Sequence, residues 1–487
     1  MTFLILTYIT GFARIKRMAK DLILEKVKQN SIEKYWLIWA NAFIVFVGWA
    51  ADITIPTLLL LSIETMVLFA LSKNTVHVLG PLWMFLFTFT ANSVDVSQNW
   101  YWFLMLLAPI AGIVIHIIRF RPKIFSKENI LKGFTVSLLL CVISTSFGGI
   151  TMARDNWVPP VVICVLFILF AFGYLFFTAT TPNSKSVAEY IAMIMFTVGI
   201  LLILQTIVVI ARIGNGEEIL NAISQKSLNY GWGWCNQIAP AICVAIPICL
   251  YYLSKAKKLS FIFGIIAALE YLIILISGSR GVILVGAVVL FAALVYYMIK
   301  TTSKLYTIVG YVAILFVFAI FFAALNDKIT LLFNHLLNSG VADNGRVDEL
   351  WIPGLQLFKD HPLFGVGLDY RLGEMKNNSY SPYWYHSTPI QILACFGVFG
   401  LITYAFLYYW RYKTFVLSIK NPLIFAILCA CLIYDGYSWV DTGFFPPNSF
   451  IILLIMTFAA DRAIKPDKLT LETVKLSRFI KKKLDNK

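Results

Sequence analysis

The sequence has few charged residues for its length. Asp, Glu, Lys and Arg make up 13% of its 487 residues, whereas a soluble globular protein usually carries roughly 25%. So few charges cannot cover the surface of a soluble fold of this size, which excludes that class. Hydrophobic residues make up 60% of the chain and the mean hydropathy is +0.80. Apolar runs of the ~20 residues needed to cross a bilayer recur along the chain, so the sequence predicts an all-α polytopic membrane protein.

Motifs for metals and disulfides are missing as well. The eight cysteines form no C-x-x-C pair, and nearly all of them fall inside apolar runs. This pattern is typical of small packing residues and not of a zinc site or a disulfide framework. No acidic cluster such as D-x-D is present, so neither a metal nor another cofactor is expected.

The N-terminus lacks the order of a cleaved signal peptide. Its positive charges follow the apolar stretch 3–12 instead of preceding it, the reverse of a secretory signal. We therefore predict that residues 1–34 form a basic cytoplasmic arm. Residues 462–487 mix apolar and basic residues and are predicted to form a basic cytoplasmic tail.

Apolar runs predict about fourteen transmembrane helices. Two blocks of spans, 35–325 and 386–461, flank one long loop at 326–385. The expected spans are 35–51, 53–71, 76–92, 100–118, 133–151, 158–179, 187–211, 236–254, 259–277, 281–299, 305–325, 386–410, 421–436 and 448–461.

The distribution of Lys and Arg gives the orientation. A net charge of +15 could indicate a nucleic-acid partner, but the basic residues lie in short loops between apolar runs. With the N-terminus inside, 31 of the 40 Lys and Arg residues fall on the inner side and 9 on the outer side. This asymmetry is that of the positive-inside rule. It predicts cytoplasmic termini, and no nucleic-acid partner is expected.

The loop 326–385 is too long for a simple connector. An Asp-Asn-Gly turn precedes Arg346, after which Leu350, Trp351, Leu355 and Phe358 recur at helical spacing. This pattern predicts a helix from about Arg346 that lies against the membrane or the bundle and ends at His361-Pro362. Long patterned loops usually carry function, so we expect an extracytoplasmic catalytic loop.

Two further sites stand out on the same side. The sequence Ser277-Gly278-Ser279-Arg280-Gly281 places an arginine between small residues at a membrane surface, where an anion can approach closely. His386 lies where the chain re-enters the membrane and could act as a general base or as a donor to an anion.

Three of these residues are expected to meet. Arg280, Arg346 and His386 lie far apart in sequence, yet the predicted topology places all three outside. Two arginines suit a phosphate or pyrophosphate, and a histidine nearby completes a minimal group-transfer site. Candidates for supporting or sugar-binding contacts are Glu270, Ser279, Asp348, Asp360, Tyr385 and Asp441.

Five segments stand in a distinctive order and spacing. They are NYGWGWCNQIAPAICVAIP (229–247), SGSRG (277–281), NGRVDELW with HPLFGVGLDY (344–370), YHSTPIQILACFGVFGL (385–401) and IYDGYSWVDTGFFPPNSF (433–450). Together they resemble the O-antigen ligase and O-antigen polymerase family of bacterial polysaccharide assembly. The resemblance covers about 229–461, and residues 1–228 match only as generic membrane spans.

The resemblance implies a metal-independent glycosyltransferase with a C-type membrane fold in the bacterial plasma (inner) membrane. Its donor would be a glycan on undecaprenyl pyrophosphate. Arg280 and Arg346 would bind the pyrophosphate, and His386 would deprotonate the acceptor hydroxyl. Partners beyond membrane lipids would be a chain-length regulator and a flippase of the same pathway. Ser387 departs from the family, which often has Asn after the histidine.

Three functions stay open on the sequence. A polymerase of lipid-linked repeat units for O-antigen, capsule or exopolysaccharide is favoured by the span count and by the Lys- and Ile-rich composition. A ligase would transfer the glycan to a terminal acceptor. A polysaccharide or lipid transporter is disfavoured because Glu64 and Glu270 are the clear acids within spans, a sparse set for a translocation path.

Overall fold

The computed structural model describes residues 31–92, 100–150, 158–225, 227–338, 346–368, 384–441 and 443–464. Helices make up nearly all of this part, and a hairpin of two-residue strands is its sheet. The elements are α2 (Ser31–Ala50), α3 (Thr54–Leu71), η1 (Thr75–Val78), α4 (Leu79–Asn92), η2 (Trp100–Leu106), α5 (Leu107–Phe120), α6 (Lys127–Ile130), α7 (Gly133–Phe147), α8 (Val158–Thr180), α9 (Lys185–Ile213), α10 (Gly216–Ser224), β1 (Asn229–Tyr230), β2 (Gly233–Trp234), α11 (Cys235–Lys255), α12 (Ser260–Ser277), α13 (Arg280–Lys300), α14 (Lys304–Asn338), η3 (Val347–Trp351), α15 (Ile352–Asp360), α16 (Thr388–Ser418), α17 (Pro422–Ser438) and α18 (Pro447–Arg462).

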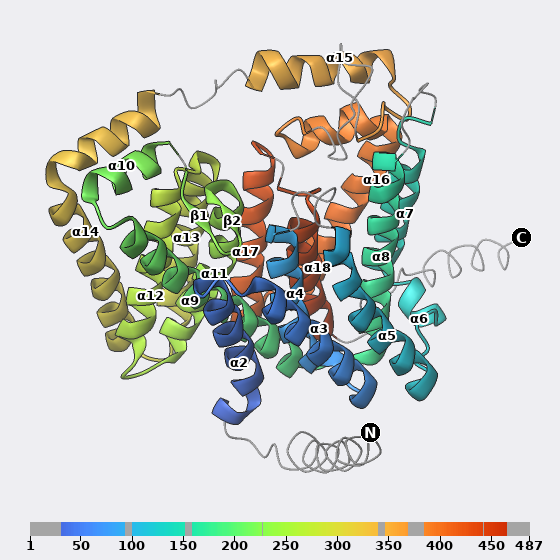
Figure 1. Ribbon diagram of the computed structural model, residues 1–487, viewed down its shortest axis with the longest axis horizontal. Helices are drawn as coiled ribbons and strands as arrows, with labels where there is room; N and C mark the ends of the chain where they lie inside the picture. Colours follow the sequence, from blue (N-terminus) through green and yellow to red (C-terminus); the bar gives the residue numbers. More distant parts are fainter. Residues whose placement is uncertain are drawn as a thin grey trace, which may run out of the picture.

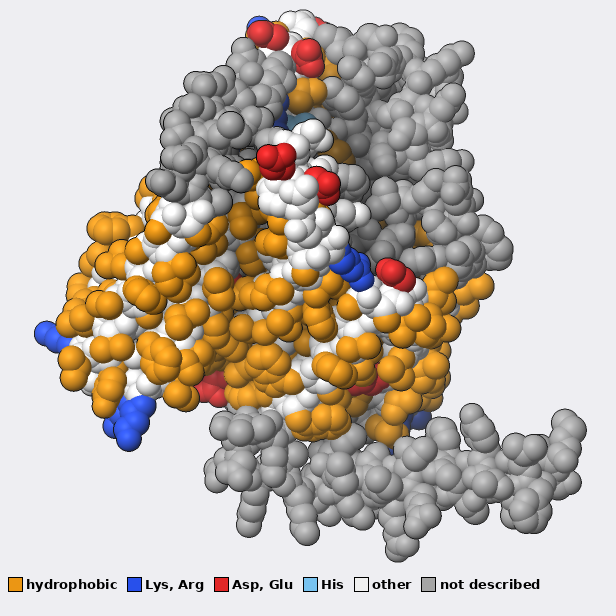
Figure 2. Space-filling model, turned by 60° about the vertical axis from the view of Figure 1, so that its left-hand side comes forward, with side chains coloured by type: hydrophobic (Ala, Val, Ile, Leu, Met, Phe, Trp, Pro, Cys, Tyr) orange, Lys and Arg blue, Asp and Glu red, His pale blue; other side chains and the backbone are white. Residues whose placement is uncertain are grey.

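The fold is that of an all-α polytopic membrane protein, as predicted. Eight helices in the described ranges are long and apolar enough to cross a membrane, and each of the fourteen expected spans coincides with a helix. Most helices stand side by side, and α15 lies across one end of the bundle (Figure 1). Figure 2 shows a broad hydrophobic band across the face in view, with Lys and Arg side chains gathered at its edges. Such a band is what a bilayer requires of a surface facing lipid.

Helix α11 forms the centre of the bundle. In its apolar stretch Ile238–Lys255, 83% of the residues are buried, against 11% in Lys304–Ala324 of α14. It packs against α9, α12, α13 and α17, so these helices surround it, whereas α14 lies at the rim (Figure 1). A helix that is apolar on all sides is buried on all sides, which explains why α11 is the central one.

Helix α16 is broken at Gly397, where φ is +62° and ψ is −155°. The segment after α15 fills the break through main-chain bonds. Val366 N–H donates to Ala394 O and Gly367 N–H to Cys395 O, both at 2.9 Å, and Val398 N–H donates to Pro362 O at 2.8 Å. Backbone groups freed by a broken helix must find partners at membrane depth, and this segment supplies them.

The structure differs from the expected spans in two places. The twelfth span, expected at 386–410, is a broken helix that continues to Ser418, so Arg411 lies inside the helix and not in the following loop. Its side chain is buried and paired with Asp435 of α17, a tertiary contact that satisfies the charge within the bundle. The eleventh span, expected to end at 325, continues to Asn338 as part of α14.

Several sequence predictions concern the ends of the chain and the middle of the long loop. The basic arm up to residue 30, the tail from residue 465 and the turn at Asn344 lie outside the described residues. The helix expected from about Arg346 is present as η3 followed by α15, and it ends at His361.

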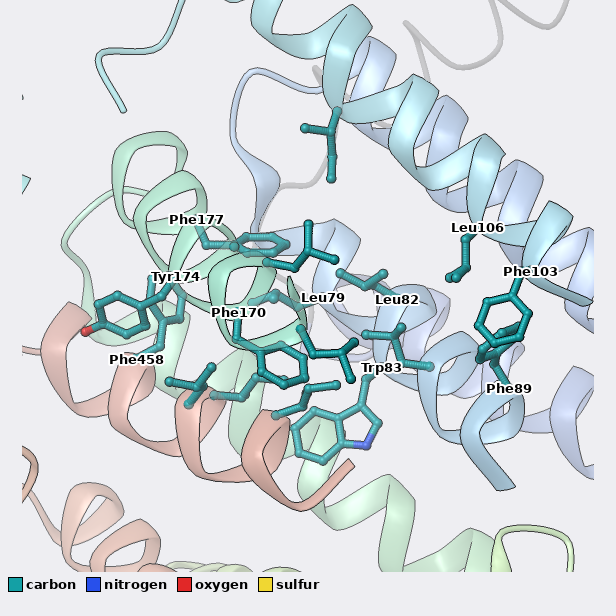
Figure 3. Close-up of a pocket in the computed structure, with 18 residues that line it drawn as sticks. Leu79, Leu82, Trp83, Phe89, Phe103, Leu106, Phe170, Tyr174, Phe177 and Phe458 are labelled. Atoms are coloured by element: carbon teal, nitrogen blue, oxygen red, sulfur yellow. The ribbon is translucent and has the colours of Figure 1, made fainter. Parts of the chain in front are cut away.

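An apolar cavity of about 330 Å³ lies between α4, α5, α8 and α18. Figure 3 shows Phe89, Phe103 and Leu106 at one end of it, Trp83 beside it and Phe177 near the other. Its lining suits hydrocarbon chains, and none of its side chains can carry acid–base chemistry at neutral pH.

The contact of the 361–368 segment with α16 depends on Gly365. A substitution at this glycine therefore tests the fold. Its φ is +63°, and a Cβ there would lie 2.3 Å from the carbonyl carbon of Cys395. We expect Gly365→Ala to lower the free energy of unfolding by about 2 kcal/mol or more, because it adds both backbone strain and a clash with main chain. Thermal unfolding in detergent measures the loss.

The matched control is Gly173→Ala in α8. A Cβ at Gly173 meets nothing within 4 Å, so this change is expected to leave the unfolding midpoint unchanged or slightly raised. Equal midpoints for the two variants would contradict the docking described for the 361–368 segment.

Candidate active site

Four chain segments that are far apart in sequence meet at one end of the bundle. Arg280 opens α13, Arg346 precedes η3, His386 precedes α16, and Asp441 follows α17. In Figure 1 this is the end that α15 crosses. Each residue stands at or next to a helix terminus, so its backbone is held by a rigid element.

His386 and Asp441 form the closest polar pair of this site. His386 Nδ1 lies 2.7 Å from Asp441 Oδ1. An ionised carboxylate only accepts hydrogen bonds, so His386 Nδ1–H is the donor; in the neutral imidazole, Nε2 then carries the lone pair. The side chain of Asp441 is 11% exposed and that of His386 40% exposed. The carboxylate is therefore sheltered, while the imidazole is open to an incoming group.

The backbone of His386 has a left-handed conformation, with φ at +48°. A residue with a Cβ adopts this region rarely and at a cost of order 1–3 kcal/mol, mostly at functional sites. The neighbours hold it in place. The Tyr385 N–H donates to Gln391 Oε1 at 2.8 Å, and the Gln391 N–H donates to Ser387 O at 2.8 Å. These bonds tie the histidine to the first turn of α16.

Arg346 binds the other oxygen of the same carboxylate. Its Nη2 lies 3.5 Å from Asp441 Oδ2, and its Nη1 donates to Val440 O at 2.7 Å. Asp441 thus lies between the imidazole and the guanidinium, one oxygen to each. The hydrogen bond to Val440 uses one of the five N–H donors of the arginine, and its side chain is 30% exposed, which suits a second anionic partner.

Arg280 lies at the same end of the bundle, and the next residue, Gly281, packs against the segment that carries Asp441. A Cβ on Gly281 would lie 2.7 Å from Val440 Cγ2 and 3.5 Å from Tyr437 Cδ2. Glycine at this position lets the start of α13 press against the turn that carries Asp441. Arg280 is half-buried, and Ser279 before it is buried.

The remaining candidates from the sequence divide into two groups. Tyr385 is buried, and its ring lies against Gly354 of α15, so it connects the Arg346 helix with the His386 turn. Asp348 and Asp360 are exposed, and Asp360 accepts from Gln356 Nε2 at 3.0 Å; their described contacts do not join them to the cluster.

Glu270 lies deeper in the bundle. Its carboxyl group is fully buried in α12 and accepts from the Cys249 thiol at 3.2 Å. Glu270 is seven residues before Ser277 at the end of α12, about 10 Å further along the axis. Gly199 leaves room for this side chain, since a Cβ there would lie 1.9 Å from Glu270 Oε1. The structure does not bring Glu270 to the cluster.

Two residues that support the site escaped the sequence analysis. Tyr437 is buried one helical turn before Asp441, and its hydroxyl donates to that carboxylate. Arg411 of α16 pairs with Asp435 of α17, and the Tyr412 hydroxyl donates to the same Asp435 oxygen. The i, i+4 spacing of Tyr437 and Asp441 was a usable signal, whereas the Arg411 pair joins two helices and has no local signal.

Within the described ranges, no group of three or more His, Cys, Asp or Glu side chains could hold a metal ion. The chemistry of the described cluster is that of one imidazole, one carboxylate and guanidinium groups. Such a set can take up a proton and stabilise developing negative charge.

Residues 261–405 match the family model Wzy_C, described as O-antigen ligase. The match runs from α12 into α16 and includes Arg280, Arg346 and His386, but it ends before Asp441. Residues 261–405 are therefore similar to the O-antigen ligase family, which confirms the resemblance seen in the sequence. The comparison with curated proteins finds no match.

The contact between α15 and Tyr385 provides a test of how the site is held together. A side chain at Gly354 would meet Ile390 Cγ2 at 2.7 Å and Tyr385 Cδ1 at 2.9 Å. We expect Gly354→Leu to lift α15 from α16 and to speed hydrogen exchange of the amides in 352–367, about tenfold for each 1.4 kcal/mol of local stability lost. Hydrogen exchange followed by mass spectrometry measures this effect.

Leu355→Ala is the control for this change, because Leu355 lies on the same helix but is 38% exposed. Its exchange rates are expected to stay close to those of the unchanged protein. Protection that survives in Gly354→Leu would show that α15 is not held through Tyr385.

Proposed function

We propose that this protein is an extracytoplasmic, metal-independent glycosyltransferase that polymerises oligosaccharide repeat units carried on undecaprenyl pyrophosphate. The observation that carries the proposal is the contact of Asp441 with both His386 and Arg346 at one end of a membrane bundle. The match of residues 261–405 to the O-antigen ligase family supports a lipid-linked glycan as the substrate.

His386 is the general base in this proposal. Its Nε2 takes the proton of the acceptor hydroxyl while the hydroxyl oxygen attacks the anomeric carbon of the donor. The new carbon–oxygen bond forms as the bond between that carbon and the pyrophosphate oxygen breaks. Asp441 accepts from Nδ1–H at 2.7 Å and stabilises the imidazolium that results, a role in which a carboxylate orients its histidine without taking the proton.

In this proposal, Arg280 and Arg346 stabilise the negative charge that develops on the leaving group. The pyrophosphate gains negative charge as its bond to the sugar breaks, and guanidinium groups match its oxygens in pairs. Because the leaving group stays attached to its lipid, the reaction belongs at a membrane interface. We place this end of the bundle on the extracytoplasmic side of a bacterial plasma membrane, with cytoplasmic termini, following the distribution of Lys and Arg.

Ligation to a terminal acceptor is the second candidate function. The description of the matched family, O-antigen ligase, favours it, and the chemistry at His386 would be the same. The two differ in acceptor, which is a lipid-linked repeat unit for a polymerase and a lipopolysaccharide core or wall polymer for a ligase. A chain-length regulator and a flippase of the same pathway would be partners of the polymerase.

Removal of the site residues tests the mechanism. With undecaprenyl-pyrophosphate repeat units as the substrate in nanodiscs, we expect a glycan ladder from the unchanged protein. We expect His386→Ala to slow its formation about 10²–10⁴-fold because the base is lost. Arg280→Ala is expected to slow it about 10²–10³-fold because leaving-group charge is less stabilised. Initial rates from gels of labelled glycan measure both effects.

His361→Ala is the matched control, because His361 caps α15 at the same end of the bundle but lies outside the proposed machinery. Its ladder is expected to form at the normal rate. Full activity in both His386→Ala and Arg280→Ala would contradict the site. It would favour transport if the protein then moved lipid-linked glycan across vesicles.

The acceptor decides between polymerase and ligase. We expect a ladder when lipid-linked repeat units are the one glycan supplied, because each unit then serves as donor and acceptor. Absence of the ladder, with transfer appearing on addition of a core or wall polymer, would overturn the polymerase proposal and establish the ligase.

A further inference from the structure

A second cavity lies at the end of the bundle opposite the candidate active site. It has a volume of about 310 Å³ and is lined by Lys185, Glu189, Tyr251 and the segment from Lys420 to Leu423. This volume falls within the range of small-molecule sites, about 300–1,000 Å³. The proposed mechanism uses none of these residues.

Positively charged groups at the N-termini of two helices line the cavity. Lys185 is the first residue of α9, and Lys420 immediately precedes Asn421, the residue that caps α17. A helix start carries roughly half a positive charge, and these helices are 29 and 17 residues long. Both helix starts and both lysines thus line one cavity. Glu189, one turn into α9, also lines it and offsets part of this charge.

The position of this cavity points to a ligand held at a membrane surface. Helix α17 begins at Pro422 in the cavity and ends at Ser438 beside the candidate active site, so the cavity is about 25 Å from that site along the helix. That distance approaches the thickness of the hydrocarbon core, about 30 Å. The cavity therefore lies near the opposite interface, which the Lys and Arg distribution assigns to the cytoplasm and where anionic headgroups occur.

We propose that this cavity binds a phosphate-bearing anion and that its occupant in the membrane is the headgroup of an anionic phospholipid. Lys185 and Lys420 supply the charge for the phosphate. The exposed position of both lysines makes the site accessible from the interface and sensitive to salt. This inference is independent of the glycosyltransferase proposal, because it involves other residues at the other end of the bundle.

Native mass spectrometry of the full chain tests the proposal. The probe is dioleoyl phosphatidylglycerol, added to detergent-purified protein and compared with dioleoyl phosphatidylcholine. We expect one phosphatidylglycerol to be retained in preference to phosphatidylcholine. The double variant Lys185→Gln with Lys420→Gln is expected to lose about tenfold or more in affinity for it, while the double variant Lys185→Arg with Lys420→Arg keeps the binding.

Glu189→Gln gives a result of opposite sign. Removing the one carboxylate that lines the cavity is expected to raise the affinity for phosphatidylglycerol severalfold. A purely structural role of Glu189 would not strengthen binding, and this variant keeps both lysines if the double lysine variant fails to fold.

Lys257→Gln with Lys258→Gln is the matched control, because these exposed lysines lie between α11 and α12 but do not line the cavity. Equal losses in this control and in the Lys185 and Lys420 variant would overturn the proposal in favour of unspecific attraction.

A second experiment distinguishes a soluble phosphate from the phosphate of a lipid headgroup. Inorganic phosphate and glycerol 3-phosphate are added to lipid-free protein, and the unfolding midpoint is followed. A midpoint that rises with the soluble anions and depends on Lys185 and Lys420, without preference for phosphatidylglycerol, would overturn the lipid as occupant. Preference for phosphatidylglycerol alone supports the proposal as stated.

Discussion

The carboxylate of Asp441 joins His386 and Arg346 in the candidate site. One oxygen accepts from His386 and the other pairs with Arg346, while the Tyr437 hydroxyl donates to the same group. Without this negative charge, the imidazole and the guanidinium would face each other as two hydrogen-bond donors. They would then have no shared acceptor to hold them in place. The turn after α17 therefore contacts both the start of η3 and the start of α16.

The membrane imposes the second constraint, through the main chain. A helix interrupted at Gly397 would leave unpaired backbone groups in a medium that offers no water. The 361–368 segment supplies those partners, and in doing so it fixes the loop that carries Arg346. The same need to satisfy charge inside the bundle accounts for the Arg411–Asp435 pair, which joins α16 to α17. These are the helices whose ends hold His386 and Asp441.

The sequence predicted the membrane fold because low charge and apolar length are properties of single segments. It also proposed Arg280, Arg346 and His386 as one site, because the predicted topology places all three on the same side of the membrane. Asp441 stood among several acidic candidates, since its partners come from segments about 55 and 95 residues away, at His386 and Arg346. Arg411 was placed in a loop because an arginine after an apolar run resembles a span end; its partner Asp435 is visible only in the packed bundle. Tyr437 was missed although it precedes Asp441 by four residues, a spacing that the sequence does show.

The docking of the 361–368 segment onto α16 has a mechanical consequence. Main-chain bonds and the Gly354–Tyr385 contact join α15, this segment and the first half of α16 into one stiff plate. The plate carries Arg346 and His386, whereas Arg280 and Asp441 belong to the body of the bundle. At the described site the two parts meet through the carboxylate of Asp441 and the carbonyl group of Val440. Any displacement of this plate would therefore move His386 and Arg346 together, so that these two side chains keep their positions relative to each other.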